Sequence, residues 1–360
     1  MSTPAASTDE LESTLKEFIG NLKKSKVSEV AVEAAEIENE LSWSLKPTKG
    51  MKLFSDVFGF KPPKPFEDFS LPVYKPNDWD EEIRPFIPKL DEGFVWDHFN
   101  AAVIALAYLN GDNTFLWGPK GSGKSTMPEQ MCARMCIPFI RIGMKEDMES
   151  SELLGANTVR AKEVVWIDGP VTTCALYGGV LCLDESSNIT PGAAIALHPL
   201  MEENRRLFLT DKMGSVEERN TNIDPRFRVF LTDNTNLQGD ITGKYVGTKV
   251  QNEAFIDRIF TRINVTYMPP KEEVEMLLKR VKDLPEKVAQ HMVKFADLIR
   301  KSYQIGHMQM TVSPRVLINW GRKAVAWGNL ANAYDVAFGN GLSDDDKKLA
   351  TEHYMKVFGK

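Results

Sequence analysis

The stretch Phe115–Thr126, FLWGPKGSGKST, joins a short apolar run to a glycine-rich loop that ends in a lysine. From Gly118 to Ser125 the spacing is Gly-x-x-x-x-Gly-Lys-Ser, the Walker A pattern of phosphate-binding loops. Glycines let the backbone turn tightly, so that its N–H groups and the start of the next helix can face an anion. A glycine turn with a chance lysine is the alternative, and the preceding apolar strand argues against it.

The residues of this loop predict a site for ATP and Mg²⁺. Lys124 is placed to reach the β and γ phosphates, and the Ser125 hydroxyl can bind Mg²⁺. The expected nucleotide-binding residues are Gly118, Pro119, Lys120, Gly121, Ser122, Gly123, Lys124, Ser125 and Thr126.

A second acidic motif follows at Val180–Glu185, where four apolar residues lead into Asp184 and Glu185. In a parallel sheet such a strand delivers its carboxylates to the edge where the phosphate loop lies. We expect Asp184 to hold Mg²⁺ and Glu185 to deprotonate the attacking water. An apolar run ending in Asp-Glu is common, but its position shortly after a Walker A loop makes it specific.

Three further residues are candidates for hydrolysis. Asn234 follows the predicted strand 228–232 and could hold the attacking water, with Thr232 and Asp233 as competitors and a plain turn asparagine as the alternative. Arg315, in Ser313-Pro314-Arg315, is expected to sense the nucleotide and report it as a rotation of the C-terminal helices.

Arg258, in the stretch Ala254–Arg258, is a candidate arginine finger, a guanidinium that neutralises developing charge on the γ phosphate. Arg262 is a near rival, and an ordinary surface salt bridge to Asp257 or Glu253 is the alternative. Such a finger usually enters from a neighbouring subunit, so this assignment predicts oligomerisation.

Composition narrows the class of protein. The chain has 360 residues, 42% of them hydrophobic, which is enough for two domains with real cores. Its net charge of −6 argues against a general nucleic-acid binder. No apolar run is long enough to cross a bilayer and the N-terminal residues lack the features of a signal peptide, so we expect a cytoplasmic protein without a membrane partner. The four cysteines read as buried free thiols.

The pattern of elements predicts an α/β fold with a parallel sheet, helices on both faces, and a separate all-helical lid. We divide the chain into a helical or partly disordered arm (1–45), a proline-rich extended segment packing on the core (46–92), a nucleotide-binding domain (93–268) and a helical lid (269–360). The predicted core strands are 114–117, 138–142, 179–183 and 228–232, with helices at 96–110, 124–135 and 193–200. Hairpins are expected within 150–169 and around 213–215.

The order of these motifs resembles that of the MoxR-like AAA+ ATPases. The motifs are Walker A, Leu153-Leu154-Gly155, Gly169-Pro170, the Walker B strand, Asn234, Asp257-Arg258 and Ser313-Pro314-Arg315. Within that clade the segment 239–248, the ending Glu352-His353-Tyr354 and the stretch Leu71–Tyr74 are similar to the CobS family, the AAA+ subunits of aerobic cobaltochelatases. The similarity runs from about Met51 to the C terminus.

This resemblance implies a ring-forming motor, expected to be a hexamer, whose ATP hydrolysis drives cobalt insertion elsewhere in a complex. It also implies two partners: a protein with a von Willebrand A domain and a large chelatase subunit that holds the corrin precursor. The alternative is a remodelling ATPase, of cellular or phage origin, that acts on a different von Willebrand A protein. The hairpin around Val164, Val165 and Trp166 could grip such a partner, and a buried Trp166 is the competing interpretation.

Overall fold

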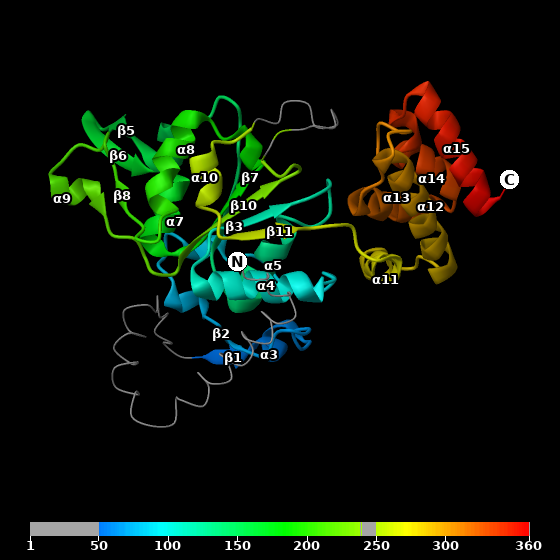
Figure 1. Cartoon of the computed structure of the whole chain (residues 1–360), viewed down its shortest axis with the longest axis horizontal. Helices are drawn as coiled ribbons and strands as arrows, with labels where there is room; N and C mark the ends of the chain where they lie inside the picture. Colours follow the sequence, from blue (N-terminus) through cyan, green and yellow to red (C-terminus); the bar gives the residue numbers. More distant parts are fainter. Residues whose placement is uncertain (1–49, 238, 240–249, 360) are drawn as a thin grey trace, which may run out of the picture. The chain divides into compact units, whose positions relative to one another are not determined.

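The computed structural model describes residues 50–237, 239 and 250–359 (Figure 1). The predicted N-terminal arm, 1–45, lies outside the described residues. Almost all of the motif 239–248 also lies outside them. The division of the chain into these four parts stays a prediction.

A five-stranded parallel sheet forms the centre of the fold, in the order β11-β3-β10-β7-β4. The strands are β3 (Thr114–Trp117), β4 (Phe139–Gly143), β7 (Gly179–Asp184), β10 (Phe227–Asp233) and β11 (Thr261–Asn264). The predicted parallel α/β class is therefore confirmed. The edge strand β11 was not predicted, because its sequence Thr-Arg-Ile-Asn lacks the apolar run of a buried strand and only Ile263 is buried.

The register of the sheet brings the ends of three strands together. Thr232 on β10 lies opposite Leu116 on β3 and opposite Asp184 on β7, and Asp233 lies opposite Trp117. The phosphate loop, the acidic pair and Asn234 follow directly after these strands. The residues predicted to bind and hydrolyse the nucleotide thus lie at the carboxyl edge of the sheet, because the strands that precede them, β3, β10 and β7, are neighbours.

Helices cover both faces of the sheet. In Figure 1, α4 (His98–Asn110) and α5 (Thr126–Met135) lie on one side, and α7 (Pro170–Tyr177), α8 (Pro191–Leu197) and α10 (Glu253–Asp257) on the other. This division follows from right-handed crossovers, because such a crossover puts its helix on one face when the chain moves one way across the sheet and on the other face when it moves back. The chain moves one way from β3 to β4 and then returns.

The position at which α5 begins explains why Pro128 can occur within this helix. The helix begins at Thr126, two residues later than the predicted start, so Pro128 occupies the third helical position. The first N–H groups of a helix have no intrahelical acceptor, and a proline there removes no helical hydrogen bond. Pro128 is buried, and α5 continues beyond it to Met135.

Two hairpins project from the α/β unit. Helix α6 (Ser150–Leu154) precedes β5 (Gly155–Arg160) and β6 (Glu163–Asp168), which pair antiparallel. The predicted hairpin is therefore confirmed, but its turn lies at Ala161 and Lys162, both with positive φ, rather than at the Asp-Gly-Pro sequence that begins α7. The second, expected around 213–215, consists of β8 (Leu207–Phe208) and β9 (Asn220–Thr221), with α9 (Val216–Arg219) in the connection.

The proline-rich segment before the sheet contains only short elements. They are β1 (Met51–Leu53), α3 (Phe54–Phe58), β2 (Ser70–Pro72) and two 3₁₀ turns, η1 (Pro76–Asp78) and η2 (Arg84–Phe86). Its aromatic residues pack as expected: Phe54 and Trp79 are buried, and the Trp79 indole N–H donates to the Cys136 carbonyl at the end of α5, at 2.7 Å. The segment is therefore part of the folded unit.

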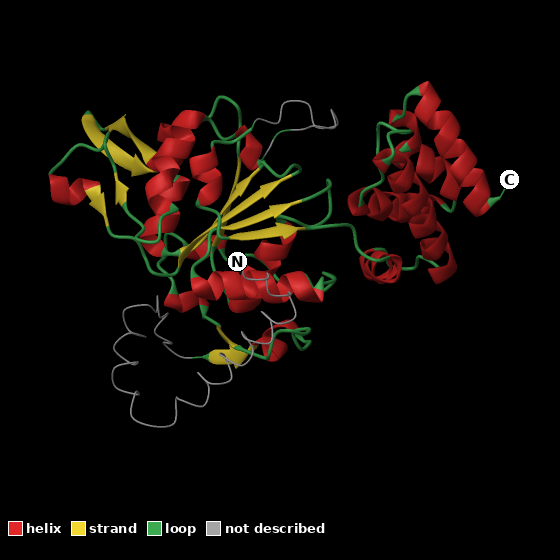
Figure 2. Ribbon diagram, viewed as in Figure 1, coloured by secondary structure: helices red, strands yellow, loops and turns green. Residues whose placement is uncertain are grey.

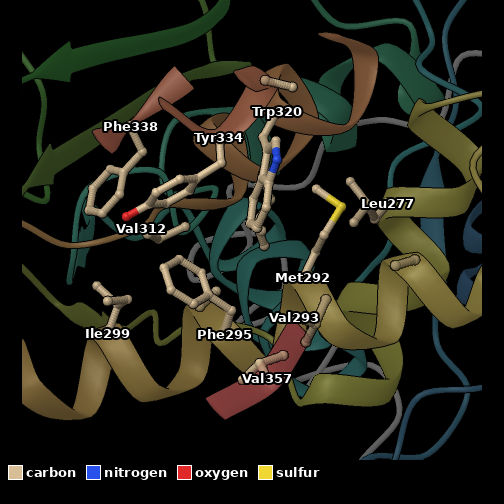
Figure 3. Packing of buried hydrophobic residues seen from close by; sticks show 14 of the residues in the cluster. Leu277, Met292, Val293, Phe295, Ile299, Val312, Trp320, Tyr334, Phe338 and Val357 are labelled. Carbon is tan, nitrogen blue, oxygen red and sulfur yellow. The ribbon is translucent and has the colours of Figure 1, made fainter. Parts of the chain in front are cut away.

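After residue 269 all described elements are helical (Figure 2). The helices are α11 (Pro270–Arg280), α12 (Glu286–Gln304), α13 (Pro314–Trp327), α14 (Leu330–Ala337) and α15 (Asp344–Phe358), with the short turn η5 (Gly339–Gly341) between the last two. Two further short turns, η3 (Ser186–Asn188) and η4 (His198–Leu200), lie earlier in the chain. Their core contains Phe295, Trp320 and Tyr334, whose rings lie within 5.6 Å of one another (Figure 3). None of the described helices has the length and apolar character to cross a membrane.

Candidate active site

A cavity of about 630 Å³ opens where the phosphate loop, the ends of β7 and β10, and the C-terminal helices meet. That volume falls within the usual range for small-molecule sites. Six basic side chains line the cavity and suit it to a polyanion. They are Lys120, Lys124, Arg141, Arg280, Arg315 and Arg322. The acids Asp184, Glu185 and Asp233 line the same cavity.

The glycines of the loop have backbone conformations that other residues rarely adopt. Gly118, Gly121 and Gly123 have φ values of 148°, 75° and 95°. A Cβ on Gly118 would lie 2.0 Å from the Val265 carbonyl oxygen, which belongs to the backbone just after β11. Since neither atom can move away without breaking the sheet edge, the loop shape requires glycine at this position.

Lys124 lies at the base of the cavity and is held by three acceptors. Its ammonium donates to the carbonyls of Gly118 and Pro119, both at 2.8 Å, and to the Asn234 side-chain oxygen at 3.1 Å. Burial lowers the pKa of Lys124 to about 8, although Asp184 and Asp233 act in the opposite direction. A bound phosphate would favour the charged form and so raise this pKa.

Asp184 accepts hydrogen bonds on both carboxylate oxygens. The Ser125 hydroxyl donates to Oδ1 at 3.0 Å, and the Thr232 hydroxyl donates to the same atom. Arg141 on β4 donates to Oδ2 through Nε at 2.9 Å and through Nη2. Burial raises the pKa of Asp184, but the hydrogen bonds from Thr232 and Arg141 outweigh it and leave the pKa below its ordinary value.

Glu185 and Asn234 line the cavity from neighbouring strand ends. Glu185 is exposed and has φ 56° and ψ 48°, a left-handed conformation that is uncommon for a residue other than glycine. Strained backbone of this kind is typical of functional turns. The carboxylate and the amide therefore stand beside the lysine and the acid of the phosphate site.

The structure distinguishes Asn234, Thr232 and Asp233, the three candidates for holding the attacking water. Thr232 bonds to Asp184, whereas Asp233 is buried and accepts from the backbone N–H groups of Ser187 at 2.6 Å and Thr235 at 2.8 Å. Asp233 thus ties the turn after β7 to the turn after β10. Only Asn234 contacts Lys124.

The two arginine-finger candidates lie elsewhere. Arg258 donates to the Ala254 carbonyl and pairs with Glu202 at 3.2 Å, and Arg262 donates to the Ile256 carbonyl. Neither lines the cavity of its own chain, whereas Arg315 does. Glu202, rather than Asp257 or Glu253, is the acid beside Arg258.

Several cavity residues were missed in the sequence. Arg141 had been seen only as part of a predicted strand. Apolar side chains that could contact a planar base also line the cavity, namely Phe94, Val95, Met268, Met276 and Ile318. These residues come from segments far apart in the chain, and no local motif marks them.

The hairpin that was expected to grip a partner exposes part of its surface. Val164 has 53% of its surface exposed and Val159 on the facing strand has 72%. Trp166 is half-buried and its indole N–H donates to Asp168 at 2.7 Å, and a role of this tryptophan in gripping a partner stays a prediction.

The residues present fit a magnesium nucleotide. A carboxylate and two hydroxyls, from Asp184, Ser125 and Thr232, meet within hydrogen-bond distance, and oxygen ligands are those that Mg²⁺ prefers. The glycine loop and Lys124 provide the cationic side of the cavity, as phosphate requires.

Comparisons with known proteins agree with this geometry. A profile of the AAA domain (dynein-related subfamily) matches residues 113–259, and a profile of the CbbQ/NirQ/NorQ C-terminal region matches residues 273–354. Aerobic cobaltochelatase subunit CobS of Sinorhizobium sp is 29% identical over 312 residues, 84% of this chain and 89% of that protein. Denitrification regulatory protein NirQ of Pseudomonas aeruginosa is 26% identical over 69% of this chain and 90% of its own length.

Protein CbbQ of Hydrogenophilus thermoluteolus is 29% identical over 60% of this chain and 75% of its own length. The first profile covers the phosphate loop, the acidic pair and Asn234, and the second begins after a gap of residues 260–272 and covers most of the helical region. With a Walker A loop, an acidic pair and a parallel sheet in the expected order, the chain belongs to the MoxR clade of AAA+ ATPases.

Proposed function

We propose that this protein hydrolyses ATP with Mg²⁺ and uses the reaction to remodel a partner protein as a homo-oligomeric ring. One observation carries the proposal: Lys124, the Ser125–Asp184 pair, Glu185 and Asn234 surround one cavity, although they come from three separate strand ends. A scaffold that only bound nucleotide would not need Glu185 beside the phosphate site.

Each residue has a chemical task in this proposal. Lys124 and the loop N–H groups hold the β and γ phosphates. Asp184 and Ser125 hold Mg²⁺, which supplies positive charge to the phosphate oxygens. Glu185 takes a proton from the attacking water, and Asn234 orients that water from the other side.

The helical region would respond to the nucleotide through contacts made by Tyr267, which lies in the hinge, the segment between β11 and α11 that connects the two regions. The Tyr267 hydroxyl donates to the Lys120 carbonyl of the phosphate loop at 3.1 Å. The Tyr267 ring packs against the Arg300 guanidinium of α12, 4.0 Å from the ring centre. Arg315 lines the cavity from the start of α13. A change at the loop therefore has a direct path to two of the lid helices, and we propose that Arg315 senses the γ phosphate.

The position of Arg258 supports the proposed ring, which we expect to be a hexamer. This side chain does not line the cavity of its own chain, so as an arginine finger it must serve a neighbouring subunit. Arg262 has the same property and stays the alternative finger.

For the output we propose a role like that of CobS, in which the ring powers cobalt insertion into a corrin precursor. The support is the share of the two proteins that aligns, 84% of this chain and 89% of CobS. The proposed partners are a von Willebrand A domain protein and a large chelatase subunit. The proposed location is the cytoplasm, which suits four unpaired cysteines.

The second candidate is remodelling of a different von Willebrand A protein, in a cellular or a phage-encoded system. It is favoured by the C-terminal profile, which is that of CbbQ, NirQ and NorQ over residues 273–354. Neighbouring genes for corrin synthesis would support the first candidate, and cobalt insertion by the purified protein with a large chelatase subunit and a von Willebrand A protein would establish it. Turnover without insertion would favour the second.

The substitution Glu185→Gln tests the hydrolytic mechanism. We expect ATP binding within about threefold of wild type and a loss of turnover of at least about 100-fold, because the amide cannot accept the proton of the attacking water. Binding is measured by titration calorimetry and turnover by phosphate release. Glu203→Gln, outside the residues that line the cavity, is the control. Undiminished turnover in Glu185→Gln would contradict the choice of base.

A further inference from the structure

Arg141 forms an ion pair with the carboxylate that the proposed function assigns to the metal. Its Nε and Nη2 both donate to Oδ2 of Asp184, while Ser125 and Thr232 occupy Oδ1. Four donors therefore use the acceptor positions of this carboxylate. A divalent cation arriving alone would find no oxygen of Asp184 without a partner.

The pair is fixed by the sheet. Strand β4 is the edge strand beside β7, and Arg141 lies opposite Cys182 while Gly143 lies opposite Asp184. The guanidinium reaches along the ladder by two residues to the carboxylate. Gly143 has no side chain, and a Cβ there would have no atom within 4 Å, so the position opposite Asp184 on β4 places no side chain against the carboxylate.

Arg141 can also reach a different kind of acceptor. It lines the same cavity as the phosphate loop and keeps 47% of its side chain exposed. A guanidinium binds phosphate oxygens as readily as carboxylate oxygens, with the same two-pronged geometry. Lys124 is in a similar state, held by two loop carbonyls and by Asn234. Both cations have protein acceptors that a polyphosphate could replace.

We propose that Arg141 is a gating residue for the divalent cation. In the free site its guanidinium occupies Asp184 and opposes metal binding by competition and by charge repulsion. When a nucleoside triphosphate enters, the guanidinium transfers to a phosphate oxygen and releases Asp184. The inference rests on the proposed function, and its consequence is that metal and nucleotide bind with positive coupling.

The test measures Mn²⁺ binding by electron paramagnetic resonance, with and without a non-hydrolysable ATP analogue. Without nucleotide, Arg141→Gln should bind Mn²⁺ about tenfold more tightly than wild type, a size usual for coupling between two ligands. With the analogue present, wild type and variant should differ by less than about threefold, since the gate is then open in both. Arg141→Lys, which keeps the charge, should retain most of the wild-type coupling.

Lys145→Ala is the matched control. It removes one positive charge from the segment that follows β4, but Lys145 is exposed and does not line the cavity. Its Mn²⁺ affinity should equal that of wild type in both conditions. Thermal melting of all variants verifies that β4 stays folded.

The outcomes separate this inference from the proposed function. If Arg141→Gln binds Mn²⁺ no more tightly than wild type without nucleotide, while the wild type binds Mn²⁺ with the analogue, the gate is refuted and the ATPase site stands. If wild type binds no Mn²⁺ even with the analogue, both proposals fail. If Lys145→Ala matches Arg141→Gln, the effect is general charge and the gate is again refuted.

Discussion

At the scale of single residues, the site is built from charges that already have partners. Lys124 contacts carbonyls and an amide, and Asp184 contacts hydroxyls and a guanidinium. Such a site keeps its geometry without ligand, because each buried charge is compensated. Nucleotide binding is then an exchange of partners, which makes affinity sensitive to the protonation state of Lys124.

That sensitivity gives a prediction on pH. Burial puts the pKa of Lys124 at about 8 in the free site, and a bound triphosphate should raise it. Below pH 8 the lysine is already charged in the free site, so the affinity for the triphosphate should not depend on pH. Above pH 8 the free lysine is neutral and must take up a proton on binding, so the affinity should fall as the pH rises. The expected loss is up to about tenfold per pH unit until the raised pKa is reached.

Fluorescence titration with an ATP analogue between pH 7 and pH 9.5, without metal, measures this dependence. Lys124→Arg keeps its charge throughout the range and should show no such fall if it binds. Equal wild-type affinity at pH 7.5 and pH 9.5 would show that Lys124 stays charged in the free site.

At the scale of elements, the helical region depends on one buried ion pair. Arg300 of α12 donates to both oxygens of Glu273 on α11, each at 2.7 Å, and to the Val312 carbonyl before α13. The two side chains have only 8% and 1% of their surface exposed. The pair therefore ties three helical segments together, and the same guanidinium packs on the hinge residue Tyr267.

We expect Glu273→Gln to lower the free energy of unfolding of the helical region by about 3–5 kcal/mol, because it leaves a buried guanidinium without its counter-charge. Chemical denaturation followed by circular dichroism measures the change. The control is Lys301→Ala, the next residue along α12, which breaks an exposed pair with Asp297 and should cost less than about 1 kcal/mol. Equal effects of the two substitutions would mean that Arg300 finds another partner.

At the scale of the whole molecule, one chain does not bring all the proposed catalytic residues to its cavity. Glu185, Asn234 and Arg315 line it, while Arg258 and Arg262 do not. A finger that acts between subunits is the arrangement in which these positions are compatible with hydrolysis. This proposal can be tested by mixing two inactive variants.

Arg258→Ala keeps an intact nucleotide site, and Lys124→Ala keeps an intact finger. Each variant alone should have little ATP turnover. In an equimolar mixture, an interface is active when an Arg258→Ala subunit provides the nucleotide site and a Lys124→Ala neighbour provides the finger. In a randomly mixed closed ring this holds at about a quarter of the interfaces, which should regain activity. Phosphate release measures the recovery, and native mass spectrometry with and without ATP measures the assembly. A mixture as inactive as its components would remove Arg258 as the finger, and the same experiment with Arg262→Ala would then decide the alternative.

Much of the fold followed from local patterns. The strands 114–117, 179–183 and 228–232 were predicted within a residue or two because they are continuous apolar runs. The edge strand β11 was missed because an edge strand is half exposed and its sequence need not be apolar. The turn of the first hairpin was misplaced because the Asp168-Gly169-Pro170 sequence, a typical turn signal, instead begins helix α7.

The sequence by itself determined the phosphate loop, the acidic pair and the class of fold, because each depends on spacing within a few residues. Only the tertiary structure decided what stands beside them. Arg141 is 43 residues from Asp184, and the two meet because β4 pairs with β7 in the sheet. The position of Arg258 outside its own cavity likewise depends on where β11 and α10 lie. Contacts between strands distant in the chain follow from sheet order, which no local spacing encodes.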